Sequence, residues 1–168
     1  MHRASAFTLI ELLTALAVIA VLAGLAVPAL DTLQLNARRA AAMEGLFRAA
    51  WLARTEALRL GRPVVLCGST RGDGCDGDPA SWSAGWVVVP AEPPGEVLRR
   101  GSGIARAGAR LLSNRSTFRF EAAQRRSTNG TLAWCDRRGV AAARAIVISP
   151  TGRPRHSRGA GSLDCAPP

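Results

Sequence analysis

An unbroken apolar run near the start of the chain dominates its pattern of hydrophobic and polar positions. Residues 7–30 are 24 consecutive positions in which Glu11 is the single charged side chain. A helix of this length crosses the hydrocarbon core of a bilayer, which is about 30 Å thick. The pattern therefore predicts a membrane-spanning helix over residues 7–30.

Helix-forming residues continue after this run, but their pattern becomes amphipathic. Residues 31–60 are rich in Ala, Leu, Arg and Glu, which favour helices. Apolar residues recur there at spacings of three and four, with larger ones beside them: Leu46, Ala50, Ala53, Ala57 and Leu60, flanked by Phe47, Trp51 and Leu58. Gly61 and Pro63 end the pattern. We therefore predict one helix over residues 7–60, about 80 Å long, whose second half, residues 31–61, packs on the rest of the chain.

Beyond Gly61 the pattern changes to short apolar or alternating segments between turns rich in Gly, Pro and Asp. Six segments are predicted strands: residues 63–67, 84–90, 96–100, 116–122, 131–135 and 143–150. In residues 116–122 aromatic and polar residues alternate, so one face of that strand is expected to be exposed. Residues 62–168 are thus predicted to form a globular antiparallel β-sheet domain that covers the apolar stripe of the helix. The predicted fold class is α+β.

Glu11 is unexpected inside a segment that otherwise suits lipid. A carboxylate within a spanning helix costs about 2.5–3.5 kcal/mol on insertion scales, and such residues are usually functional. A secretory signal peptide and a plain membrane anchor both explain the apolar run, but neither explains Glu11. If residues 1–6 are removed as a leader, the amine of Phe7 becomes a cation four residues from Glu11. That amine, on the same or a neighbouring copy, is the partner we expect for the carboxylate.

The segment FTLIELLTALAVIAVLAGLAVP resembles the N-terminal segment of type IV pilins and pseudopilins. The resemblance implies a type IV pilin-like fold, cleavage between Ala6 and Phe7 by a prepilin peptidase, and N-methylation of Phe7. It also implies that Glu11 pairs with the N-terminal amine of a neighbouring pilin. The family usually has glycine before the cut, where this chain has Ala6. The implied location is the inner membrane, crossed once, with the globular domain in the periplasm before assembly into a pilus or pseudopilus.

Cysteine usage suggests an exported domain. The four cysteines, which allow three full pairings, are Cys67, Cys75, Cys135 and Cys165. None forms the closely spaced pair of a zinc site, so disulfides are expected if the chain is exported. We favour Cys67–Cys75, which closes a short loop rich in Gly and Asp, and Cys135–Cys165, which ties down the C-terminal segment. We predict no metal and no other cofactor.

The globular part resembles the GspH/FimT family of minor pilins and pseudopilins. In residues 63–90 the resemblance lies in two cysteines that flank a short loop, followed by Trp82 and the Gly85-Trp86-Val87 run. In residues 130–155 it lies in a glycine turn, a cysteine and a last strand, followed by Gly152-Arg153-Pro154-Arg155. Trp82 and Trp86 are interpreted as packing residues rather than as a ligand platform.

Positive charge is concentrated in the second part of the chain. The formal net charge is +10, and residues 101–168 contain twelve arginines against three acidic residues. Arg153, Arg155 and Arg158 follow the last predicted strand on a loop rich in Gly and Pro. Guanidinium groups bind phosphate oxygens in a forked geometry, so this loop is predicted to follow a nucleic-acid backbone without reading bases. The alternative is a solvated turn in an arginine-rich chain. Further positive field is expected from three other arginines: Arg137, Arg138 and Arg144.

The family resemblance points to the same segment. FimT-like minor pilins with a Gly-Arg-x-Arg tail are linked to DNA binding during natural transformation, and Gly152, Arg153, Pro154 and Arg155 match that motif. We therefore expect a minor type IV pilin with DNA and other pilins as its partners. The alternative is a GspH-like pseudopilin at the tip of a type II secretion pseudopilus, which contacts proteins. We recognise no catalytic set and predict no enzyme, and we interpret His156 as a spectator or a neighbour of phosphate rather than as a catalytic base.

Overall fold

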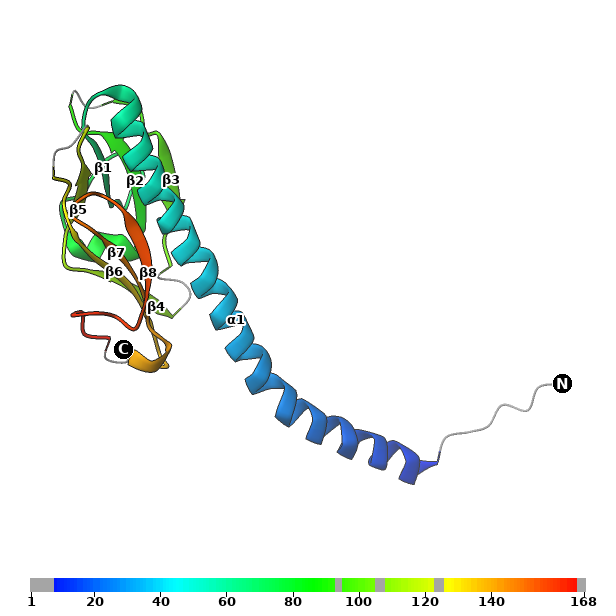
Figure 1. Cartoon of the computed structure of the whole chain (residues 1–168). Helices are drawn as coiled ribbons and strands as arrows, with labels where there is room; N and C mark the ends of the chain where they lie inside the picture. Colours follow the sequence, from blue (N-terminus) through cyan, green and yellow to red (C-terminus); the bar gives the residue numbers. More distant parts are fainter. Residues whose placement is uncertain (1–7, 93–94, 105–107, 123–125, 166–168) are drawn as a thin grey trace. The chain divides into compact units, whose positions relative to one another are not determined.

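One long helix runs from the start of the described chain into its globular part. The structure is a computed structural model that describes residues 8–92, 95–104, 108–122 and 126–165 (Figure 1). Helix α1, Leu9–Leu60, has 52 residues and continues through Pro28. It ends at the predicted residue, because Gly61 takes a φ of 64° that suits glycine after a helix terminus. The chain consists of two compact units, residues 1–38 and residues 39–168.

The first unit, where it is described, is the apolar part of α1. Its large side chains are exposed, and Leu9, Val21 and Leu25 keep 75%, 65% and 71% of their surface accessible. The helix is long and apolar enough to cross a membrane. An apolar surface of this extent is typical of a segment covered by lipid or by other proteins.

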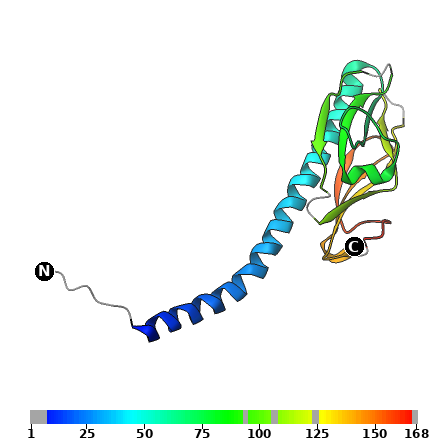
Figure 2. The same ribbon diagram turned by 180° about the vertical axis from the view of Figure 1, so that it is seen from behind.

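The second unit contains two four-stranded antiparallel sheets (Figures 1 and 2). The first sheet has the order β3-β2-β1-β5, with β1 at Val64–Gly68, β2 at Gly85–Pro90, β3 at Arg99–Ser102 and β5 at Thr117–Phe120. The second has the order β4-β6-β7-β8, with β4 at Ala109–Ser113, β6 at Gly130–Asp136, β7 at Arg144–Ile148 and β8 at Pro154–Arg158. Among the described residues, short 3₁₀ helices at Pro79–Ser83 and Val140–Ala142 connect strands.

Small side chains on α1 bring the helix close to both sheets. Most of the predicted stripe is buried, namely Leu46, Ala50, Ala53 and Ala57, and Met43 and Ala49 join it. These residues share one hydrophobic core with both sheets, for example with Leu66 and Val88 of the first and Leu132 and Ile146 of the second. Leu58, also placed beside the stripe by the sequence pattern, is 52% exposed. Trp82 and Trp86 are buried in this core, so their interpretation as packing residues is confirmed.

Four features of the β domain differ from the sequence-based expectation. The strands form two sheets rather than one, and β4 was not predicted because its arginine and serine obscure the apolar pattern. Strand β3 begins at Arg99 instead of residue 96. Most importantly, the predicted basic loop after the last strand is itself strand β8, paired with β7. Proline is compatible with this position because it is the first residue of an edge strand, where a missing N–H is tolerated.

The segment after β8 covers the outer face of the second sheet. Ala160, Leu163 and Cys165 pack there against the small side chains of Ala133 and Ala145, in a second hydrophobic cluster. The disulfide Cys135–Cys165 fastens this segment to β6. It therefore restrains the residues that follow β8, while the β7 ladder holds β8 itself.

The second disulfide, Cys67–Cys75, closes a short loop that follows β1. Both bonds are the ones favoured from the sequence. The loop is largely exposed, and at its tip Arg71 and Asp73 form an exposed ion pair of 3.5 Å. Within it the backbone N–H of Thr70 donates to the carboxylate of Asp76.

Candidate nucleic-acid interface

The turn between β7 and β8 has a defined hydrogen-bonded geometry. The N–H of Gly152 donates to the carbonyl of Ser149 (2.8 Å), and the N–H of Ser149 donates to the carbonyl of Arg153 (3.1 Å). The N–H of Arg153 also donates to Oγ of Ser149 (3.1 Å). This pattern fits a hairpin with a type I turn and a bulge, in which a residue of positive φ is required. The turn therefore places Arg153 rigidly just before β8.

Gly152 is required at this turn for two reasons. Its φ is 72°, a conformation that side chains with a Cβ rarely adopt. A Cβ here would also lie 2.9 Å from Oγ of Ser127 and 3.1 Å from a guanidinium nitrogen of Arg54. The glycine of the Gly-Arg-x-Arg motif thus fixes the shape of the turn rather than offering a contact to a ligand.

Strand β8 presents its arginines on two sides of the sheet. Residues of a strand alternate between faces. His156, opposite Ile146, faces α1. Arg158, two residues further on and opposite Arg144, lies on the same face as His156. Arg155 is opposite Val147 and projects from the other face. The motif arginines Arg153 and Arg155 are therefore separated from Arg158 by the strand itself, an arrangement that a loop prediction did not anticipate.

Three arginines of this segment are exposed and have no acidic partner. Within the described ranges, no carboxylate lies within ion-pair distance of Arg153, Arg155 or Arg158. Some arginines elsewhere are neutralised, as Arg119 is by Glu121 at 2.7 Å. β8 also lies at an edge of its sheet, bonded to β7 alone. The guanidinium groups of β8 are thus available to an anionic partner.

Arg138 was expected to add positive field to the DNA site, but its guanidinium group is paired with a carboxylate of the fold. Its Nε and terminal nitrogen donate to the two oxygens of Asp136, at 3.0 and 2.7 Å. Asp136 is buried and also accepts a hydrogen bond of 2.9 Å from Nε1 of Trp134. The charge of Arg138 is therefore largely compensated within the fold, so its contribution to a DNA site is smaller than the sequence suggested. Arg137, next to it, is exposed.

The Asp136–Arg138 pair predicts a pH dependence of stability. The pKa of Asp136 is held well below its usual 3.8, chiefly because Arg138 hydrogen bonds to the charged carboxylate. A group with a lowered folded pKa contributes stability above its unfolded pKa, and loses it as the pH falls. We expect the free energy of unfolding to decrease below about pH 4. Urea unfolding at several pH values measures it, and Asp136→Asn should be less stable at neutral pH yet less sensitive to acid. An unchanged acid sensitivity in the variant would contradict this assignment.

Arg144 lies at the far end of the hairpin from Arg153, together with an arginine that the sequence did not suggest. A terminal nitrogen of Arg144 donates to the carbonyl of Ala143 at 2.7 Å, and Arg39 of α1 donates to the carbonyl of Ala142 at 2.6 Å. Arg39 is 103 residues from Ala142 in sequence, so only the tertiary fold could reveal this proximity. His156 stacks on Phe47 with ring centroids 4.3 Å apart, and its Nε2 is 3.7 Å from a Glu44 oxygen.

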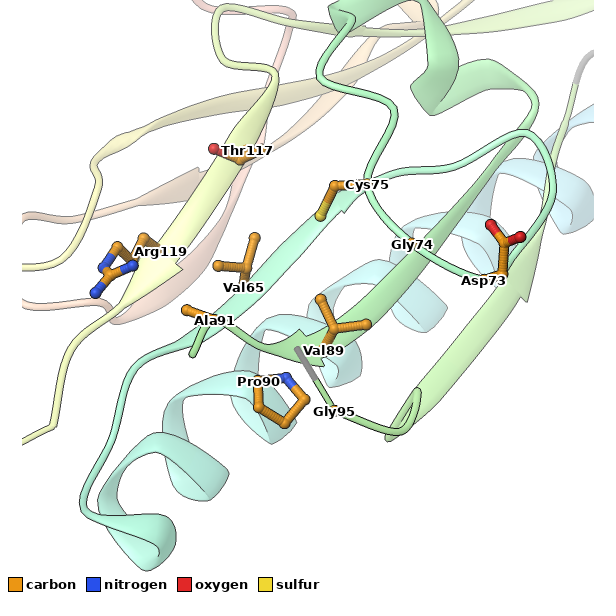
Figure 3. A pocket seen from close by; sticks show the side chains of 10 residues that line it. All are labelled: Val65, Asp73, Gly74, Cys75, Val89, Pro90, Ala91, Gly95, Thr117 and Arg119. Carbon is orange, nitrogen blue, oxygen red and sulfur yellow. The ribbon is translucent and has the colours of Figure 1, made fainter. Parts of the chain in front are cut away.

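A separate pocket of about 370 Å³ lies on the outer face of the first sheet (Figure 3). Val65 and Val89 form its apolar floor, and Asp73 and Arg119 contribute charged groups. It lies on the sheet that does not contain β8. No group of three metal-ligating side chains is found in the part of the chain that the structure describes.

The start of α1 contains a local partner for Glu11. A carboxylate oxygen of Glu11 accepts hydrogen bonds of 3.1 Å from the N–H and from Oγ1 of Thr8, and the N–H of Glu11 donates to Thr8 Oγ1 (3.3 Å). This reciprocal pattern is a capping box, which the sequence analysis missed although Thr8 and Glu11 have the required spacing. Ala6 and Phe7, the predicted cleavage and methylation residues, lie outside the described residues.

Comparison with protein families assigns the chain to one of them. The family model described as type II transport protein GspH matches residues 42–152. The chain belongs to the GspH family. The model of the prokaryotic N-terminal methylation motif matches residues 1–27. Membership of this pilin and pseudopilin family implies assembly with other pilins, and the methylation motif implies processing by a prepilin peptidase.

Solved structures agree with the fold of this GspH-family chain. Two crystal structures of the type IV minor pilin FimU of Pseudomonas aeruginosa PAO1 match it with a TM-score of 0.55 each. One is 19% identical and covers 75% of this chain and 98% of its own, and the other is 20% identical and covers 78% and 97%. At this identity the likeness shows the type IV pilin fold alone. No curated protein matches the chain.

Proposed function

We propose that this GspH-family chain is a minor type IV pilin that binds the DNA backbone through β8 and the turn before it, during DNA uptake in natural transformation. The observation that supports the proposal is the set of three exposed arginines, without acidic partners, along an edge strand: Arg153, Arg155 and Arg158. Guanidinium groups contact phosphate oxygens without reading base edges. The binding is therefore independent of sequence, weak for a single copy, and strengthened by several copies in one fibre.

The N-terminal segment has a separate role in this proposal. Residues 1–6 are a leader that a prepilin peptidase removes, and Phe7 becomes the methylated N-terminus. Residues 7–30 anchor the chain in the inner membrane and later pack among pilin helices, with Glu11 facing the amine of a neighbouring subunit. The globular unit then lies in the periplasm before assembly, where its disulfides are stable.

Charged residues on β8 also have a simpler explanation. Arginine and proline on an edge strand prevent it from pairing with a strand of another chain. That explanation needs positive charge at the edge but no DNA. The two explanations differ in their consequence for binding, so an arginine-to-glutamine substitution that removes charge but keeps a polar side chain separates them.

Replacing Arg153 and Arg155 by glutamine is expected to abolish most DNA binding. Each lost phosphate contact reduces the slope of log K against log salt by about 0.9, so the double variant should lose about two. Fluorescence anisotropy of labelled duplexes with unrelated sequences, titrated at several salt concentrations, measures the slope. Both side chains are exposed, so the melting temperature should remain that of the parent. In cells, transformation should decrease while pili still form.

A matched control is provided by the edge strand of the other sheet. Arg99 and Arg100 on β3 are also adjacent, exposed arginines, so Arg99→Gln with Arg100→Gln removes the same charge at a different place. This control should retain the DNA affinity and salt slope of the parent. If both double variants bind DNA as the parent does, the basic strand serves edge protection, and a pseudopilin that contacts proteins becomes the better assignment.

A further inference from the structure

A second cationic site lies at the opposite end of β8 from the turn. A pocket of about 300 Å³ is formed where the second half of α1 meets β7 and β8. Its charged or titratable lining residues are Arg39 and Glu44 of α1, Arg144 of β7 and His156 of β8. The pocket thus joins a helix and a strand pair that are far apart in sequence.

The two arginines are held in place by neighbouring backbone groups. Arg39 donates to the carbonyl of Ala142 (2.6 Å) and Arg144 to that of Ala143 (2.7 Å). A guanidinium group has five N–H donors, and these bonds use only part of that capacity. Fixed arginines lose less conformational freedom when they bind an anion than mobile ones do. The remaining donors therefore form a preorganised set.

The positive charge of this pair is not neutralised within the described part of the chain. Neither Arg39 nor Arg144 forms an ion pair there. The pKa of Arg39 is lowered, first by burial and then by the positive charges of Arg144 and Arg138, although Asp136 opposes this shift. Like charges that are held together favour an anion between them. The pocket is therefore electrostatically incomplete without a ligand.

We propose that Arg39 and Arg144 bind a phosphate group in this pocket, and that the DNA backbone supplies it as a second contact beside that of Arg153 and Arg155. The claim that DNA supplies this phosphate rests on the proposed function. Arg158 of β8 is exposed and lies opposite Arg144 of β7. It adds positive charge at the same end of the strand. His156 lines the pocket and offers a ring nitrogen to the phosphate.

One carboxylate in the pocket opposes an anion and must be accounted for. Glu44 is 3.3 Å from Arg48 Nε and 3.7 Å from His156 Nε2. Its charge is therefore paired with Arg48 rather than with Arg39 or Arg144. In the lining, Arg39 and Arg144 therefore have no ion-pair partner among the described residues, whereas Glu44 is paired with Arg48.

The spacing of the two contacts suits a nucleic-acid backbone. Five residues of β8 span about 16 Å at 3.3 Å each. One DNA strand has a phosphate every 3.4 Å of helix rise, so this length corresponds to about five steps along the duplex. A backbone that runs along the exposed edge of β8 can thus meet Arg153 on one face of the strand, near one end, and the pocket on the α1 face, near the other.

The test uses the full chain in an uncharged detergent, which introduces no phosphate. Arg39→Gln with Arg144→Gln should reduce the salt slope for duplex DNA by about two, whereas Arg99→Gln with Arg100→Gln should leave it unchanged. Arg39→Lys with Arg144→Lys keeps both charges and should retain the slope. Melting temperatures of all variants show whether the Gln pair still folds. If the Gln pair does not fold, the phosphate titration described next decides.

Inorganic phosphate provides an arm that is independent of DNA. Its titration should shift the side-chain Nε–H NMR signals of Arg39 and Arg144 in the parent. Suppose that the Arg39→Gln, Arg144→Gln variant folds and keeps the parental salt slope, whereas the Arg153→Gln, Arg155→Gln variant has a reduced slope. The pocket proposal is then overturned and the proposed function stands. If the parent does not bind DNA, the proposed function fails, and the phosphate titration alone decides whether the pocket is a phosphate site. Absence of any shift overturns the pocket in that case.

Discussion

Replacing Glu11 with alanine is expected to give a chain that is produced, inserted and processed but is almost absent from fibres. In our proposal the carboxylate faces the N-terminal amine of a neighbouring subunit, which loses its counter-charge in the variant. Insertion itself should improve, since a charged residue in the apolar segment costs about 2.5–3.5 kcal/mol. Immunoblots of membranes and of sheared fibres measure the two pools separately.

The capping box at Thr8 gives Glu11 a second role, and one substitution separates the two. Glu11→Gln keeps a side chain that can accept the bond from the N–H of Thr8, because glutamine also serves at this position of a capping box. It removes only the charge. If the amine pairing is essential, the glutamine variant should be excluded from fibres as strongly as the alanine variant. Normal incorporation of the glutamine variant would show that helix capping, not charge, is what assembly requires.

Trp134→Ala is expected to have the largest effect on the stability of the globular unit. Trp134 is fully buried, and loss of a buried tryptophan side chain costs about 3–5 kcal/mol. The substitution also removes the Nε1–H bond to Asp136 at 2.9 Å, which leaves a buried carboxylate with fewer donors. Together these losses approach the whole stability of an ordinary domain, about 5–15 kcal/mol. Urea unfolding of residues 31–168, followed by circular dichroism, measures the loss.

Trp134→Phe is the matched control because it keeps much of the apolar volume but has no N–H donor. We expect it to cost about 1–3 kcal/mol, the penalty of a lost hydrogen bond to a charged group. A similar cost for both variants would mean that the hydrogen bond to Asp136, and not the packing, is the dominant contribution. A cost below about 2 kcal/mol for the alanine variant would contradict the core assignment altogether.

Local signals were sufficient for much of the architecture. The end of α1 was predictable because Gly61 and Pro63 act on their immediate neighbours. The buried stripe followed from spacing alone, as Leu46 and Ala53 show. In β5 the alternation of aromatic and polar residues predicted two different faces; Phe118 and Phe120 are buried, while Thr117 and Arg119 on the face expected to be exposed are half-buried.

The rest depended on contacts that no local pattern encodes. Strand β8 looked like a loop because its Pro154 and the preceding Gly152 were taken as breakers, whereas its β7 partner supplies the ladder. The opposite faces of Arg155 and Arg158 follow from that strand and could not be derived from a loop. Arg39 belongs to a helix face that meets β7 only in the tertiary fold, so its place in the candidate site had no signal in the sequence. The ion pair of Arg138 with the buried Asp136 was likewise not evident from the sequence.

The loop closed by Cys67–Cys75 offers a means of visualising assembled fibres. Its side chains are exposed and its ends are covalently joined, so a substitution at its tip should not disturb the two sheets. The chain contains no lysine. A lysine introduced as Thr70→Lys would therefore be its only side-chain amine, and an amine-reactive dye would mark this point on each incorporated subunit in addition to its N-terminal amine. The backbone bond from Thr70 to Asp76 does not involve the replaced side chain and would keep that dye at a fixed place on the subunit surface.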